Sequence, residues 1–161
     1  PGAGLPADSV AARTFGNAMI EVAASTTEAW RRAEIPAANG HGNARSIVRA
    51  QSLLANGGTA FGKQIMTPEG CRRALEVQVI GDDLVLGVPA RFGLGYGLSG
   101  PETPISPNAN TCFWGGWGGS TVVVDQDAHL CFSYVMNKMD DGVTGDKRGG
   151  NLAAAVYASL A

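Results

Sequence analysis

Residues 112–120 read CFWGGWGGS, a stretch in which four glycines stand beside two tryptophans. Glycine leaves the backbone bare, whereas tryptophan carries the largest apolar side chain. The segment TCFWGGW predicts a strand at 111–117. The following segment STVVVDQDAHLCFSYVMN, residues 120–137, predicts a β-hairpin that turns at Asp125–Ala128, because β-branched and aromatic residues lie on both sides of a polar turn.

Upstream of this stretch, RFGLGYGLSG alternates large apolar residues with glycine. Phe92, Leu94, Tyr96 and Leu98 fall on every second position, which is the period of a strand. We therefore predict one strand over 91–98. Glycine otherwise weakens a strand, so its bare face predicts another backbone or a helix packed closely against it.

Helix signals surround these strands. Residues 1–24 show little periodicity and predict irregular or partly helical structure. We expect a short helix capped at Ser25 and stopped by Pro36, a strong helix from the N-cap Asn43 to Gly57-Gly58, a short helix behind the N-cap Thr67 with Pro68 at its first position, and a closing helix within 144–161. Helices followed by an antiparallel sheet and a last helix indicate an α+β fold. We expect a helical and irregular segment at 1–83 and the strands with the C-terminal helix at 84–161.

Composition excludes several classes of function. The chain of 161 residues has 12 basic and 14 acidic residues and no basic cluster, which argues against binding of nucleic acid or an anionic membrane. Its apolar runs are far shorter than the roughly 20 residues that span a bilayer. Three cysteines without CxxC spacing and two histidines support neither a zinc site nor a disulfide framework, so we expect no metal or organic cofactor and a reduced, cytoplasmic setting.

Several catalytic motifs do not occur in these residues: the phosphate loop, GxGxxG before a helix, HExxH and GxSxG. No serine has a lysine three residues later, the spacing in which a lysine takes up the hydroxyl proton. We interpret His41, expected at a helix start, and His129, expected on a strand, as structural or surface residues. Tyr96 and Tyr134 are interpreted as alternating sheet residues rather than general bases.

An ordered set of segments nevertheless resembles a known family. EIPAANGHGNARSIVRAQSLLANGG, LGVPARFGLGYGL, FWGGWGGS and SYVMNKM are similar to the C-terminal portion of serine β-lactamase-fold hydrolases, closest to the family VIII carboxylesterases, which are related to class C β-lactamases and DD-peptidases. The resemblance covers essentially the whole chain. It implies an antiparallel sheet flanked by helices beside an all-α region, with a serine and lysine of an S-x-x-K helix and a tyrosine motif located before the matched region.

The resemblance also implies site residues. Trp114-Gly115-Gly116 is the counterpart of the K-T-G strand, and the backbone N–H of Trp117 is the implied oxyanion donor. Small residues let a substrate approach such an edge, which Gly115 and Gly116 permit. Trp114 stands where relatives carry Lys or His, which removes a cationic hold on a carboxylate and favours neutral esters. Asn137 is expected near the mouth of the site, and Trp117 is expected to line a pocket.

Two hypotheses follow. In the first, the chain, which begins PGAGLPADSV without an initiator Met, is a fragment of a serine carboxylesterase. It is then inactive alone, and its expected partners are the N-terminal portion with the Ser, Lys and Tyr and a small ester substrate. In the second, the chain is a non-catalytic binding or interaction domain of the same lineage. A β-lactamase-like or peptidase-like amide hydrolase is a further alternative.

Overall fold

A computed structural model describes residues 4–17 and 21–160 of the chain. These residues form two compact units, one from residues 1–42 and 82–88 and the other from residues 43–81 and 89–161. The first unit contains α1 (Val10–Gly16), the 3₁₀ helix η1 (Val22–Thr26) and α2 (Glu28–Arg32). No helix in the described ranges is long and apolar enough to cross a membrane.

An antiparallel sheet forms the second unit's centre, with strands in the order β3-β4-β5-β6-β7-β8. A separate two-stranded ribbon pairs β1 with β2. The strands are β1 (Thr59–Ala60), β2 (Lys63–Gln64), β3 (Val79–Asp82), β4 (Pro89–Phe92), β5 (Gly97–Leu98), β6 (Thr111–Gly115), β7 (Thr121–Asp125) and β8 (Leu130–Tyr134). The helices of this unit are α3 (Ala44–Ala55), α4 (Pro68–Arg73) and α5 (Lys147–Ala158).

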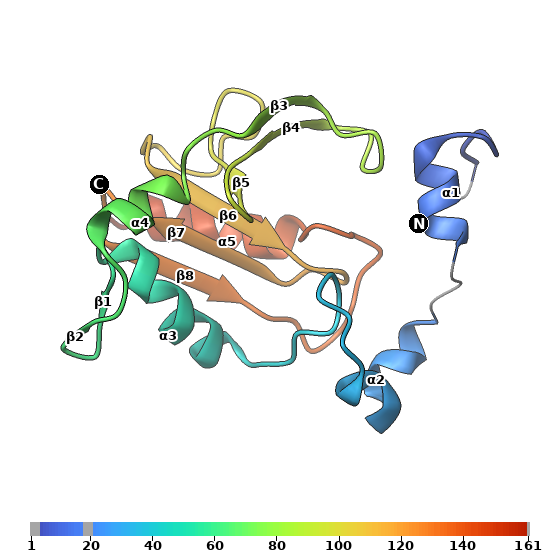
Figure 1. The fold of residues 1–161 in the computed structure, drawn as a ribbon, viewed down its shortest axis with the longest axis horizontal. Coiled ribbons are helices and arrows are strands. Elements are labelled where there is room, and N and C mark those ends of the chain that lie inside the picture. The colour runs from blue at the N-terminus through green and yellow to red at the C-terminus, as the bar shows by residue number, and fades with distance from the viewer. Residues whose placement is uncertain (1–3, 18–20, 161) are drawn as a thin grey trace. The chain divides into compact units, whose positions relative to one another are not determined.

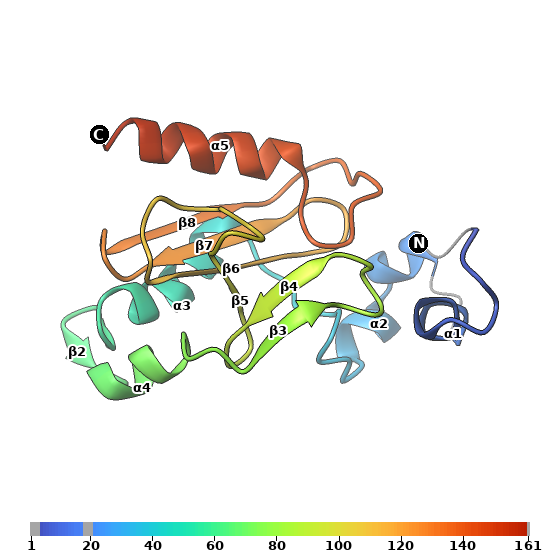
Figure 2. The ribbon, with the colours of Figure 1, turned by 90° about the horizontal axis from the view of Figure 1, so that it is seen from above.

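Helices cover both faces of this sheet. Figure 2 shows α5 along one face of β6, β7 and β8, with α3 and α4 on the other. The apolar core lies on the α3 and α4 side, because residues of these two helices pack there against strand residues that point to the same face. Its buried members are Leu54, Ala55, Cys71, Leu98, Cys112 and Val124. The sheet thus draws two of its covering helices from the segment that precedes residue 84, and the predicted division of the chain at 83 and 84 stays a prediction.

Most local predictions are confirmed. The 120–137 hairpin forms as β7 and β8, with Asp125 paired to Leu130 across the turn. Asn43 caps α3 in a capping box with Ser46, and the side chain of Thr67 accepts the N–H of Gly70 at the start of α4. The closing helix is α5 (Figure 1). The α+β class with an antiparallel sheet and flanking helices is therefore confirmed.

Three local predictions are wrong. The expected 91–98 strand is two strands, because the chain turns between Phe92 and Gly97 with Gly95 at φ +83° and the Gly93 N–H donating to the Tyr96 carbonyl. Alternation of glycine with large residues describes a tight turn as well as a strand. Helix α2 is capped by Thr27 rather than Ser25, whose hydroxyl instead donates to the Val22 carbonyl. His129 lies in the β7–β8 turn at φ +52°, not on a strand.

A buried carboxylate joins the end of β7 to the segment before β6. Asp125 is fully buried, and its two oxygens accept five hydrogen bonds at 2.8–3.0 Å. The cluster connects the segment before β6, the β7–β8 turn and α5. Hydrogen bonds to an ionised acceptor are stronger than those between neutral groups. The donors are the hydroxyls of Ser106 and Tyr157, the amide of Asn108 and the N–H groups of Asp127 and Ala128.

We expect Asp125→Ala to lower the free energy of unfolding by about 3 kcal/mol or more, since buried donors lose a charged acceptor. Burial raises the pKa of the Asp125 carboxyl, but the hydrogen bonds it accepts outweigh burial and lower the pKa below its ordinary value. The stabilisation is therefore complete above the pKa of an unfolded aspartate, about 3.9, and is lost as the pH falls through the folded value. Denaturant unfolding of both proteins at neutral and acidic pH measures this, and equal stabilities at neutral pH would contradict it.

Candidate functional site

Strand β6 extends beyond its neighbour β5. The β5–β6 register pairs Leu98 with Cys112 and Gly97 with Phe113, where β5 begins. On the other side, β7 stays paired with β6 as far as Gly115 opposite Thr121. Past Phe113, β6 therefore has a partner on its β7 side while β5 no longer covers its other edge.

Trp117 follows β6 by two residues. The Ser99 N–H donates to the Thr111 carbonyl at 2.9 Å on the β5 side, and the Gly116 N–H donates to the Ser120 carbonyl at 2.8 Å on the β7 side. Gly116 and Trp117 lie beyond the end of β6, and the Gly119 N–H donates to the Gly116 carbonyl, so Trp117 is the second residue of a tight turn. Within residues 4–17 and 21–160, the Trp117 N–H donates no hydrogen bond.

The tight turn that contains Trp117 spans residues 116–119. Gly118 and Gly119 adopt φ values of +89° and +121°, a region that disfavours side chains. The Gly118 N–H donates to the Gly142 carbonyl at 2.8 Å, and the Gly119 N–H donates to the Gly116 carbonyl at 3.1 Å. A Cβ on Gly119 would overlap the carboxylate of Asp146 at the start of α5. Glycine at 119 thus lets the start of the C-terminal helix lie close to this turn.

The two glycines of the Trp-Gly-Gly segment differ in what surrounds them. A Cβ on Gly115 would overlap the backbone of Thr144 and Gly145, and one on Gly116 would overlap the hydroxyl of Ser120. Packing within the protein is therefore enough to require glycine at 115. Its role in substrate approach stays a prediction, as does that of Gly116.

Trp114 is on the opposite face of β6 from Gly115 and is 38% exposed. Its ring lies 5.4 Å from that of Phe92, with the two planes tilted by 55°. Such a pair forms an apolar wall beside the open edge. Both side chains of this wall are uncharged.

Asn137 is exposed and follows β8 by three residues. The chain after it returns to the turn behind Trp117, where the Asp140 N–H donates to the Gly118 carbonyl at 3.0 Å. The structure thus ties the segment that follows Asn137 to the segment that carries Trp117. Contact of Asn137 with a substrate stays a prediction.

Other candidate nucleophiles and bases are engaged elsewhere. Tyr96 donates to the Gln51 side chain at 2.7 Å, and burial raises the pKa of its hydroxyl. A ring nitrogen of His129 lies 3.2 Å from the Ala55 carbonyl. Burial raises the pKa of Cys112 to about 12 and that of Cys131 to about 11, so both thiols are protonated at neutral pH and poorly nucleophilic. The described ranges contain no group of three or more His, Cys, Asp or Glu residues suited to a metal ion.

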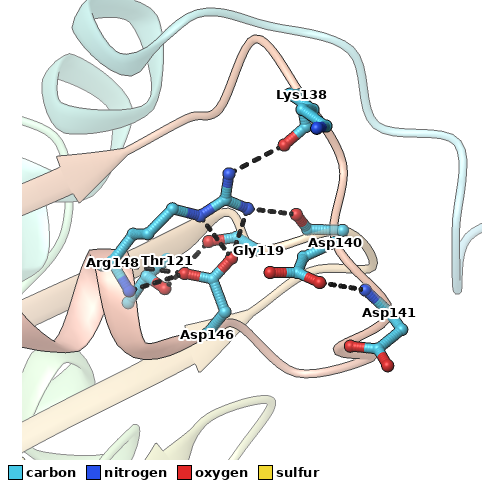
Figure 3. A network of polar contacts seen from close by, with 9 residues as sticks. Gly119, Thr121, Lys138, Asp140, Asp141, Asp146 and Arg148 are labelled. Atoms are coloured by element: carbon cyan, nitrogen blue, oxygen red, sulfur yellow. Dashed lines mark hydrogen bonds and ion pairs between the residues drawn. The ribbon is translucent and has the colours of Figure 1, made fainter.

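One part of the site was not predicted from the sequence. Figure 3 shows Arg148, at the start of α5, extending towards the turn behind Trp117 and bound to Asp146. Its Nε donates to Asp146 at 2.9 Å, and its two terminal nitrogens donate to the carbonyls of Lys138 at 2.9 Å and Gly118 at 3.0 Å. The only signal for it in the sequence is the Asp of GDKRGG, a typical N-cap residue.

The comparison with protein families identifies the fold's lineage. The model of the Beta-lactamase family matches residues 2–157. The chain belongs to the beta-lactamase family.

Solved structures support this membership of the beta-lactamase family. A family VIII carboxylesterase is 36% identical with a TM-score of 0.83, over 89% of this chain and 39% of that one. A penicillin-binding protein homologue from Caulobacter crescentus is 39% identical with a TM-score of 0.77, over 84% of this chain and 37% of that one. Among curated proteins, the esterase/beta-lactamase LipL of Mycobacterium tuberculosis is 36% identical over 111 residues.

This beta-lactamase-family chain is much shorter than these relatives. The match to LipL covers 66% of this chain but 24% of LipL, and the two structures above are matched over less than two fifths of their length. The resemblance to β-lactamase-fold esterases is confirmed at the level of family and fold.

Proposed function

We propose that this chain is part of a serine hydrolase that cleaves carboxylic esters through an acyl-enzyme, and that it supplies the Trp117 N–H to the oxyanion hole. The observation that carries the proposal is the N–H of Trp117, which lies just past the end of β6 and has no acceptor in the described ranges. Family membership and the esterase-like relatives support the reaction class.

In the proposed mechanism, the nucleophilic serine, its lysine and the tyrosine come from a portion of the protein outside these 161 residues. The serine oxygen attacks the ester carbonyl carbon while its proton passes to the base. The carbonyl oxygen gains the negative charge, and the Trp117 N–H donates to it. The C–O bond to the alcohol then breaks with protonation of the alcohol, and water releases the acid from the acyl-enzyme by the same steps. One such donor is worth roughly 10² to 10³ in rate.

The surroundings of Trp117 favour a neutral substrate. Trp114 gives the edge an apolar wall with Phe92, where a lysine would attract a carboxylate. The Arg148 guanidinium is already bound to the Asp146 carboxylate and two carbonyls. An anionic β-lactam would therefore gain little charge compensation here. A cytoplasmic location is part of the proposal, supported by Cys71, Cys112 and Cys131 being free thiols.

A substrate comparison tests this proposal in the complete protein, with the serine-containing portion present. We expect kcat/KM for a short-chain nitrophenyl ester to exceed that for a carboxylate-bearing β-lactam by about tenfold or more, since one well-placed charged contact is worth that much. Trp114→Lys should narrow the ratio by restoring the cation, and Trp114→Phe is the matched apolar control. Faster turnover of the β-lactam would favour an amide hydrolase, and no turnover of either would favour a non-catalytic binding domain.

A further inference from the structure

A single side chain joins the two segments that carry the predicted site residues. The Arg148 guanidinium donates to the carbonyl of Gly118, the residue after Trp117. It also donates to the carbonyl of Lys138, the residue after Asn137 (Figure 3). These segments are about 20 residues apart in sequence. The guanidinium holds both at hydrogen-bond distance from one point.

Asp146 holds the Arg148 guanidinium in place. The Asp146 side chain is 9% exposed and binds Arg148 through Nε and a terminal nitrogen. Its other oxygen accepts the N–H groups of Arg148 at 2.8 Å and Gly149 at 3.4 Å, which caps α5. Gly149 and Ala153 of α5 are buried. The Arg148–Asp146 pair is therefore anchored to a buried part of α5 rather than in solvent.

The turn packs closely against the Arg148–Asp146 pair. A Cβ on Gly119 would overlap Asp146 and lie 2.8 Å from an Arg148 nitrogen, and one on Gly118 would lie 2.7 Å from Met139. The hydrogen bond with Arg148 lowers the pKa of Asp146, and the same bond raises the pKa of Arg148. Both partners stay charged across the neutral range.

We propose that Arg148 is a positioning residue for the oxyanion hole: it fixes the turn behind Trp117 so that the Trp117 N–H stays directed at the substrate edge, and it holds the Asn137 segment in the same register. This inference rests on the proposed function. It assigns the guanidinium to the protein's own carbonyls rather than to a substrate carboxylate.

The geometry requires an arginine. Three acceptors lie in different directions around one planar group, and a guanidinium presents five N–H donors in a fixed fork. A lysine ammonium at the same position carries the charge but is a point donor on a flexible chain. It could satisfy Asp146 without holding both carbonyls.

The test uses the complete protein with the serine-containing portion and a neutral nitrophenyl ester. We expect Arg148→Met to lower kcat by about tenfold or more while KM changes less than threefold, because a displaced donor weakens the transition state more than the bound ester. Lys147→Met, an exposed neighbour in the same helical turn, is the matched control. Ethylguanidinium added to Arg148→Ala should restore part of kcat. Such rescue is not expected if the substitution acts only by destabilising the fold.

Outcomes separate the two proposals. Unchanged kcat in folded Arg148→Met, with an active unaltered protein, would overturn the positioning role and leave the proposed function in place. If Arg148→Met does not fold, Arg148→Lys decides: a reduced kcat supports the role, and full kcat overturns it. An unaltered complete protein that hydrolyses no ester would overturn the proposed function, and the positioning role with it.

Discussion

Replacing Trp117 with proline is expected to lower the kcat of the complete protein on a neutral ester by about 100-fold, with a much smaller change in KM. Proline has no backbone N–H, so the substitution removes the donor proposed for the oxyanion. The donor acts on charge that develops during attack, so its loss affects the transition state more than ester binding. The measurement is steady-state hydrolysis of a nitrophenyl ester.

Two controls separate the N–H from the side chain and from folding. Trp117→Phe keeps the N–H and an aromatic ring, and we expect it to retain kcat within a few-fold. Replacing Trp117 by its α-hydroxy acid exchanges the amide for an ester, which removes the N–H with the indole in place. Wild-type kcat in this second, folded protein would show that the oxyanion is bound by other donors.

The larger effect is expected from separating the chain from the rest of the protein. Residues 1–161 alone should show no saturable ester hydrolysis, because no serine in them has the S-x-x-K spacing and the three thiols are buried or partly buried with raised pKa values. Addition of the serine-containing portion should restore turnover.

A covalent label checks the same point independently of assembly. A nitrophenyl phosphonate modifies an activated serine, and peptide mapping by mass spectrometry locates the adduct. We expect it outside residues 1–161. A phosphonylated serine within these residues, or saturable turnover by the isolated chain, would place the nucleophile in this chain and contradict the account.

The sequence predicts those elements whose signals are local. Asn43 and Thr67 are N-caps in the sequence and in the structure, since a cap depends on three or four neighbouring residues. The β7–β8 hairpin is predicted for the same reason, because its polar turn separates two β-branched runs. The prediction of the α2 cap is wrong because Ser25 and Thr27 offer equivalent side chains two residues apart. Ser25 belongs to η1, where its hydroxyl donates to the Val22 carbonyl.

Elements that depend on distant packing are harder to predict. The glycines of 93–97 serve a turn and two close approaches: a Cβ at Gly93 would overlap the Ala74 carbonyl, and one at Gly97 would lie 3.1 Å from the Phe113 ring. Neither neighbour is adjacent in sequence, so alternation alone could not distinguish a turn from a strand. The strand that carries Trp114 is predicted except for its last two residues, because its partner, β7, follows directly. Gly116 and Trp117, expected at its end, lie beyond β6 in the turn.

For the site, the resemblance to a family points to Trp117, and the structure adds that its N–H has no acceptor in the described ranges. The role proposed for Arg148 could not be predicted from the sequence. Its acceptors are backbone carbonyls 10 and 30 residues away, and backbone carbonyls leave no pattern in a sequence. Only the folded arrangement shows that one guanidinium joins the segments of Trp117 and Asn137.

The most direct test of the account is a crystal structure of the complete protein phosphonylated on its nucleophilic serine, because the phosphonyl oxygen occupies the position of the oxyanion. We predict that this oxygen lies about 2.7 to 3.1 Å from the backbone nitrogen of Trp117. A phosphonyl oxygen bound by other donors, with the Trp117 N–H directed away from it, would contradict the proposal that this N–H binds the oxyanion.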